Sequence, residues 1–72
     1  MRATYDKKHG LGYVYLTKRD QRAFRTVHVE DDLNGVVLDF NHHGHLIGIE
    51  FLSKKAMPPD LRRIAKPPRS RA

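Results

Sequence analysis

The stretch that most constrains the fold runs from Gly35 to Leu52, with the sequence GVVLDFNHHGHLIGIEFL. It contains two apolar runs joined by a short polar segment that ends in glycine. Two such runs around a glycine-containing loop are typical of a β-hairpin. We therefore predict paired strands at Val36–Phe40 and His45–Leu52.

The register of this hairpin depends on the length of its loop. A four-residue loop would place Leu38 opposite Ile47, whereas a three-residue loop with Gly44 as a left-handed bulge would place Leu38 opposite Gly48. The residues leave both registers open. In either case, a glycine at position 48 in mid-strand predicts a large side chain lying over it.

Three earlier segments also have strand character: Met1–Tyr5, Leu11–Leu16 and Phe24–Val29. Polar segments that contain glycine separate the first two of these strands and precede the hairpin, as expected of turns. Leu11–Leu16 carries apolar side chains on both faces, which indicates a strand inside the sheet and not at its edge. The six aromatic side chains are the largest apolar groups of the chain, and we expect them to be packed inside.

The pattern changes after the hairpin. Pro59 and Asp60 suit the first turn of a helix, and Leu61, Ile64 and Ala65 follow at helical spacing. The last segment, 66–72 (KPPRSRA), has no large apolar side chain and is expected to be flexible. We predict one α+β domain over residues 1–65, with a four- or five-stranded, mostly antiparallel β-meander and one short C-terminal helix, followed by a basic tail over 66–72.

The size of the chain predicts association. A chain of 72 residues buries only about 60% of its unfolded surface, so its core stabilises the fold weakly. With no cysteine, disulfides and thiolate metal sites are excluded. One short helix cannot cover both apolar faces of the predicted sheet. We therefore expect a homodimer or a complex with another small protein.

The net charge of +6 is unevenly distributed. Residues 1–52 contain seven basic and seven acidic residues, whereas residues 53–72 contain seven basic residues and a single acid. Such a basic extension can bind phosphates without reading sequence. The candidate residues for contact with nucleic acid or a partner are Lys54, Lys55, Arg62, Arg63, Lys66, Arg69 and Arg71. A solubilising tail, or one that folds onto an acidic protein, explains the same charge.

Two clusters of side chains suggest chemistry but support it poorly. The imidazoles of His42, His43 and His45 could bind a transition metal. Only Asp39 is near enough in sequence to add a further ligand, however, and a solvent-exposed loop explains the same residues. Asp39 and Glu50 fall several residue pairs apart in the hairpin, too far for a pair of catalytic carboxylates. We expect no enzymatic activity, no metal and no cofactor.

Several short motifs resemble a known family. They are Tyr5-Asp6, the strand around Tyr13, Asp39 followed by Gly44, and the strand that begins Gly48-Ile49-Glu50. Together they resemble the bacterial and phage proteins grouped as domain of unknown function family 2283. The chain departs from that family at Gly10 and in the loop 41–43, where the family often carries acidic residues.

The resemblance implies a small α+β domain with a mostly antiparallel sheet and no established activity. It also implies a regulatory or antitoxin-like role, because some members of the family look like partners of toxin-like proteins. The chain has neither a signal peptide nor an apolar run long enough for a membrane span, so we expect a soluble, cytoplasmic protein. The leading hypothesis is a non-enzymatic protein-binding module, and the alternative is nucleic-acid binding through the basic C-terminal segment.

Overall fold

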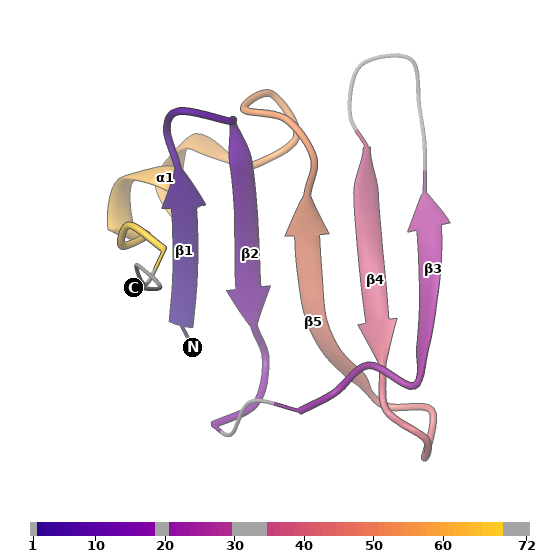
Figure 1. The fold of residues 1–72 in the computed structure, drawn as a ribbon. Helices are drawn as coiled ribbons and strands as arrows, with labels where there is room; N and C mark the ends of the chain where they lie inside the picture. The colour runs from indigo at the N-terminus through magenta and orange to yellow at the C-terminus, as the bar shows by residue number, and fades with distance from the viewer. Residues whose placement is uncertain (1, 19–20, 30–34, 69–72) are drawn as a thin grey trace.

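A computed structural model describes residues 2–18, 21–29 and 35–68 of the chain. Five strands form one antiparallel sheet, and one short helix follows them (Figure 1). The elements are β1 (Arg2–Asp6), β2 (Leu11–Tyr15), β3 (Arg25–Val29), β4 (Val36–Phe40), β5 (Leu46–Phe51) and α1 (Pro59–Ile64). This confirms the predicted α+β class and each predicted element, with bounds that differ by a residue at several ends.

The strands are not arranged in simple sequence order. The order across the sheet is β1-β2-β5-β4-β3, so β2 pairs with β5, and β3 lies at the far edge. The compositions of the strands account for this order. β5 is mostly apolar and takes the central place, whereas β3 carries Arg25 and His28 and is better placed where side chains reach water. The prediction that the Leu11–Leu16 segment lies inside the sheet is confirmed.

The β4–β5 hairpin has neither of the two expected registers. Leu38 pairs with Ile49, and Phe40 pairs with Leu46, with an irregularity between Asp39 and Phe40. Asn41 explains the longer loop, because its side-chain oxygen accepts hydrogen bonds from the backbone N–H groups of His43 and His45, each at 3.0 Å. The hairpin therefore has a five-residue loop followed by a bulge in place of the shorter turns. The sequence did not predict this loop, because spacing alone does not reveal the hydrogen bonds of Asn41.

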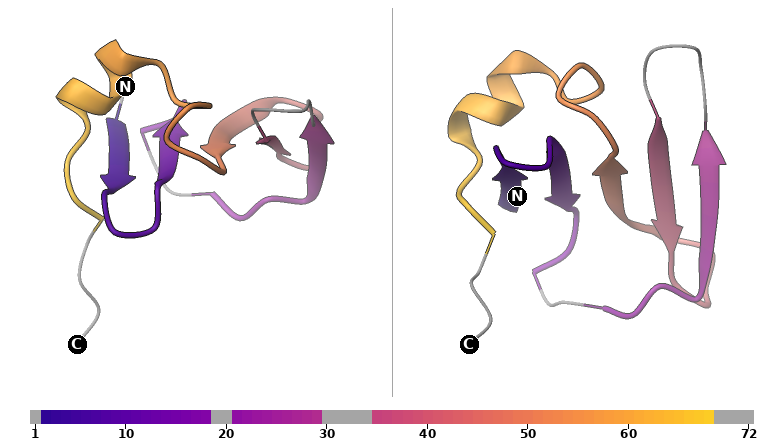
Figure 2. Two further views of the ribbon diagram at one scale, coloured as in Figure 1. Left: turned by 90° about the horizontal axis from the view of Figure 1, so that it is seen from above. Right: turned by 45° about the horizontal axis from the view of Figure 1, so that its top comes forward.

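The core lies between the sheet and the segment that leads into α1. Met57 is fully buried and packs with Val14 and Phe51. Gly12 makes room for it, since a Cβ atom there would lie 2.3 Å from the Met57 sulfur. We call the side of the sheet that carries Met57 and α1 the helix face, and the opposite side the far face (Figure 2).

α1 packs at the β1 end of the helix face (Figure 2). Leu61 and Ala65 pack against the core, as expected, but Ile64 is 64% exposed. The predicted three-residue stripe is therefore wrong at Ile64. The helix ends at Ile64, and Ala65 already has extended backbone angles, so Ala65 packs on the core without sharing a helical face with Ile64. Phe24 is 75% exposed, which corrects the expectation that all six aromatic side chains are inside.

The segment after α1 runs along the edge of β1. The backbone of Lys66 accepts a hydrogen bond from Tyr5 N at 2.9 Å and donates one to the oxygen of Ala3 at 3.0 Å. Lys66 thus forms a parallel bridge with Thr4. The expected flexible tail does not include Lys66, while residues 69–72 lie outside the described residues. No helix within the described ranges is long and apolar enough to cross a membrane.

Candidate functional site

Three of the family-like residues, Tyr13, Gly48 and Asp39, meet on the far face. Tyr13 on β2 reaches across β5 and donates a hydrogen bond of 2.7 Å from its hydroxyl to Asp39 on β4. Its ring lies directly over Gly48, where a Cβ atom would be 2.0 Å from the hydroxyl oxygen. The prediction that Gly48 lies beneath a large neighbour is confirmed, and the neighbour is Tyr13.

The environment of Tyr13 stabilises its neutral form. Burial and the hydrogen bond to Asp39 raise the pKa of Tyr13 above its usual range, and the charges of Asp39 and Glu50 act in the same direction. Glu50 lies directly opposite Tyr13 in the β2–β5 pair. A neutral tyrosine held in this way is a structural hydrogen-bond donor that ties three strands together.

The other motif residues have different structural positions. Tyr5 and Ile49 pack against the core on the helix face. Asp6 organises the β1–β2 turn: its carboxylate accepts hydrogen bonds from the backbone N–H groups of Lys8 at 2.9 Å and His9 at 3.3 Å. The side-chain hydrogen bond with His9 lowers the pKa of Asp6. Gly44 has a φ of 83°, which favours glycine in the hairpin loop. These motif residues therefore shape the fold.

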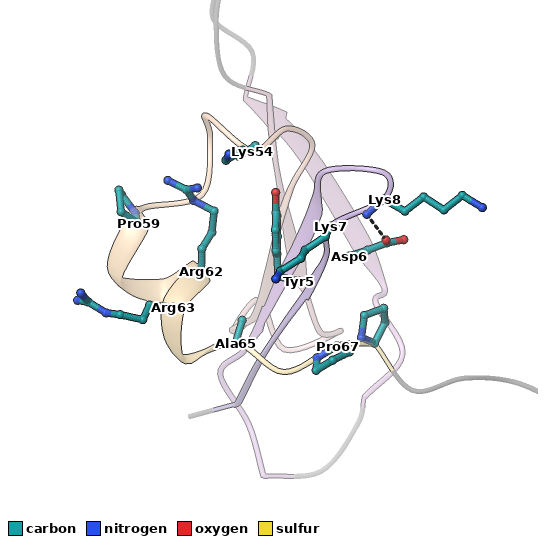
Figure 3. A pocket seen from close by; sticks show the side chains of 11 residues that line it. Tyr5, Asp6, Lys7, Lys8, Lys54, Pro59, Arg62, Arg63, Ala65 and Pro67 are labelled. Carbon is teal, nitrogen blue, oxygen red and sulfur yellow. Dashed lines mark hydrogen bonds between the residues drawn. The ribbon is translucent and has the colours of Figure 1, made fainter.

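A basic cleft of about 1020 Å³ lies between α1, the β1–β2 turn and the segment after β5 (Figure 3). Five of its lining residues are basic and one is acidic. The lining residues, which together define the basic cleft, are Tyr5, Asp6, Lys7, Lys8, Lys54, Pro59, Arg62, Arg63, Ala65, Pro67 and Pro68.

Only some of the predicted basic residues line this cleft. Lys54, Arg62 and Arg63 line it, whereas Lys55 and Lys66 are exposed outside its lining. Arg69 and Arg71 lie outside the described residues. The structure thus brings together three of the seven predicted residues.

Lys7 and Lys8 were not among the predicted site residues, although they line the cleft. They lie in residues 1–52, where basic and acidic residues are equal in number, and no local motif indicates that they belong to a basic site. The link is tertiary: a Cβ atom on Gly10 would lie 3.5 Å from the backbone nitrogen of Lys54, so the β1–β2 turn and the segment after β5 are close neighbours.

β3 forms the other edge of the sheet. Its single strand partner among the described residues is β4, and its side chains are exposed except at Val27, which is half-buried. Val29 is 50% exposed, and Phe24, which precedes the strand, is 75% exposed. This edge thus combines free backbone groups with exposed apolar side chains.

The histidine loop at the tip of the β4–β5 hairpin shows no ligand cluster. The rings of His42 and His43 have centroids 3.9 Å apart, and those of His43 and His45 are 6.2 Å apart. Within the described ranges, no group of three or more histidine, cysteine or acidic side chains is arranged to hold a metal ion.

Comparison with known proteins gives a family but no characterised relative. A family model described as "Protein of unknown function (DUF2283)" matches residues 2–54. No curated protein and no solved structure matches the chain significantly. The matched region spans all five strands and includes the Tyr13, Gly48 and Asp39 cluster. The chain therefore belongs to the DUF2283 family of proteins of unknown function.

Proposed function

We propose that this protein is a non-enzymatic protein-binding module that associates through β3, with a second copy of the chain as its partner. The observation that carries the proposal is the difference between the two edges of the sheet. Lys66 forms a bridge at the middle of the β1 edge, whereas the edge at β3 has no such bridge among the described residues. An uncovered edge strand is a template for pairing with another strand.

The helix face beside β3 is also suited to association. Val27 and Val29 pair with Leu38 and Val36 of β4, and the four side chains lie on the same face as Phe51. α1 lies at the opposite end of this face, beside β1 (Figure 2). Pairing at β3 would join the apolar helix faces of the two copies into one continuous surface.

The sequence of β3 is compatible with antiparallel pairing to itself. In a two-fold pairing centred on Val27, Arg25 lies opposite Val29 of the second copy, and Thr26 lies opposite His28. Like charges directly opposite each other destabilise a sheet, and this pairing places none opposite each other. A two-fold arrangement of this kind is the commonest form of homodimer.

Cysteine cross-linking tests this proposal directly, because the natural chain has no cysteine. Directly opposite residues of antiparallel strands have Cα atoms about 4.5–5.5 Å apart, within the range of a disulfide. We expect Val27→Cys to form a disulfide-linked dimer rapidly under mild oxidation. The matched control is Ile64→Cys, at an exposed position on α1, which should cross-link slowly.

Sedimentation equilibrium of the unmodified chain provides the second measurement. We expect a mass that increases from one chain to two chains with concentration. A constant monomer mass, together with equal cross-linking at Val27→Cys and Ile64→Cys, would overturn the proposal. Circular dichroism of each variant shows whether it has kept the fold.

A more specific form of this proposal is the regulatory or antitoxin-like role that the family resemblance implies. It predicts that one defined small protein competes with the second copy for β3. The check is a purified complex with that protein in which Val27→Cys no longer gives the symmetric dimer. If a complex forms and the symmetric cross-link persists, the partner does not use β3.

A further inference from the structure

The geometry points to the basic cleft as a binding site for single-stranded nucleic acid, with its cations on the phosphates and Tyr5 against a base. This inference goes beyond the proposed association at β3 and does not depend on it. The cleft is lined by Tyr5 and Asp6 of β1, and β1 and β3 are opposite edges of the sheet (Figure 1).

The first argument is the unbalanced charge of the cleft. Lys7, Lys8 and Lys54 have no ion pair with a described residue. Arg63 is paired with Asp60. The one acidic lining residue, Asp6, is already bonded to the β1–β2 turn and to the His9 ring, 2.7 Å away. The cleft therefore contains several cations whose charge the described residues leave uncompensated, and an anion can supply that compensation.

The second argument is that the cleft is held in place by backbone contacts. The hydrogen bonds of Lys66 with Ala3 and Tyr5 fix one wall along β1. Arg62 donates from Nε to the backbone oxygen of Met57 at 3.2 Å, and Met57 is fully buried. The guanidinium of Arg62 is thus oriented before any ligand arrives, which lowers the entropic cost of binding.

The third argument selects the class of anion. Figure 3 shows the side chains of Tyr5, Lys54 and Arg62 around one part of the cleft, with Lys7 close by in the same lining. A positively charged groove that also offers an aromatic ring is the arrangement by which proteins bind single strands, because phosphates meet the cations and a base stacks on the ring. An acidic peptide would use the cations but would not need an aromatic ring at Tyr5 in the lining.

The size of the cleft agrees with an extended ligand. A volume of about 1020 Å³ is at the upper end for small-molecule sites and is sufficient for more than one nucleotide. A duplex keeps its bases stacked inside, so it can offer phosphates but no free base face. We therefore expect single strands to bind more tightly than a blunt duplex of equal length.

The test is fluorescence anisotropy with a labelled 15-nucleotide oligothymidylate, at several salt concentrations. We expect Lys7→Gln/Lys54→Gln to weaken binding on the order of fivefold and to reduce the salt slope by about 1.4, since each phosphate contact on a single strand contributes about 0.7. The matched control is Lys18→Gln/Arg22→Gln, which removes the same charge at exposed positions outside the cleft. Equal effects of the two double variants would overturn the site.

A second variant distinguishes nucleic acid from an acidic peptide. Tyr5→Leu keeps an apolar side chain against the core but removes the stacking surface. Stacking on one base is worth at least about a fivefold change in affinity, so we expect at least that loss for the oligonucleotide. If Tyr5→Leu binds the oligonucleotide normally, or if polyglutamate competes as well as unlabelled oligothymidylate, the cleft is a general anion site and the inference is wrong.

Discussion

At the scale of single residues, Gly48 and Tyr13 form a matched pair. The glycine leaves space that the tyrosine ring occupies, and the ring then reaches Asp39 two strands away from its own backbone. Each residue explains the other, since neither a smaller ring nor a larger residue at position 48 would allow the contact. This pair accounts physically for two of the motifs through which the chain resembles its family.

We predict that Gly48→Ala lowers the free energy of unfolding by about 1–3 kcal/mol, because the new methyl group overlaps the Tyr13 ring. The same substitution in a Tyr13→Thr background should cost clearly less, since the overlap is then gone. Urea denaturation of the four chains in this cycle measures the coupling. An equal cost in both backgrounds would show that the ring is not the obstacle.

Tyr13 also predicts a dependence of stability on pH. Its pKa is raised in the folded chain, whereas in the unfolded chain a tyrosine titrates near about 10. The contribution of neutral Tyr13 is therefore fully present below about pH 10 and is lost as the pH rises further, toward the folded pKa. We expect the free energy of unfolding to fall more steeply above pH 10 for the natural chain than for Tyr13→Phe. Parallel urea titrations measure both slopes, and equal slopes would contradict this.

At the scale of elements, Met57 connects α1 to the sheet. The helix is a short one, Pro59–Ile64, with no buried residue of its own, and a helix of this length is not stable alone. The buried anchor instead lies just before the helix, where Met57 packs over Gly12, Val14 and Phe51. Met57 is therefore the one fully buried anchor of α1 among the described residues, beside the half-buried contacts of Leu61 and Ala65.

We predict that Met57→Ala lowers the free energy of unfolding by about 2–4 kcal/mol, through lost burial and the cavity that it leaves. The control is Ile64→Ala, at an exposed position, which should change stability by less than about 0.5 kcal/mol. Thermal or urea unfolding compares the two variants. A similar loss at both positions would mean that α1 contributes through its own face and not through the Met57 anchor.

At the scale of the whole molecule, the sheet has two unlike edges and one half-covered face. The chain covers the β1 edge and the neighbouring part of the helix face with its C-terminal segment and α1. It has five buried apolar residues among those that the structure describes. With so small a core, the proposed association at β3 would stabilise the fold by mass action.

We predict that the melting temperature of the natural chain rises with protein concentration, because a dimer that forms only from folded chains stabilises the fold by mass action. Introducing like charges at the two-fold centre, as in Val27→Lys, should remove this dependence, whereas Ile64→Lys should keep it. Differential scanning calorimetry over a wide concentration range measures the effect. A melting temperature that is independent of concentration in the natural chain would contradict the proposed association.

The sequence by itself determined the elements of this protein, because strand alternation, glycine-containing turns and the Pro59-Asp60 helix start are local signals. It also determined that Gly48 needs a large neighbour and that the core is small. Only the tertiary structure decided which strands are neighbours: β5 lies between β2 and β4 because the most apolar strand is best buried at the centre.

The same limit applies to the candidate sites. Lys7 and Lys8 lie far from Lys54 and Arg62 in the sequence, and no periodicity relates them; they line one cleft because β1 and α1 pack together. The long loop of the hairpin depends on side-chain bonds from Asn41 that spacing does not encode. Local patterns fix local geometry, whereas a surface built from distant segments exists only once those segments have packed.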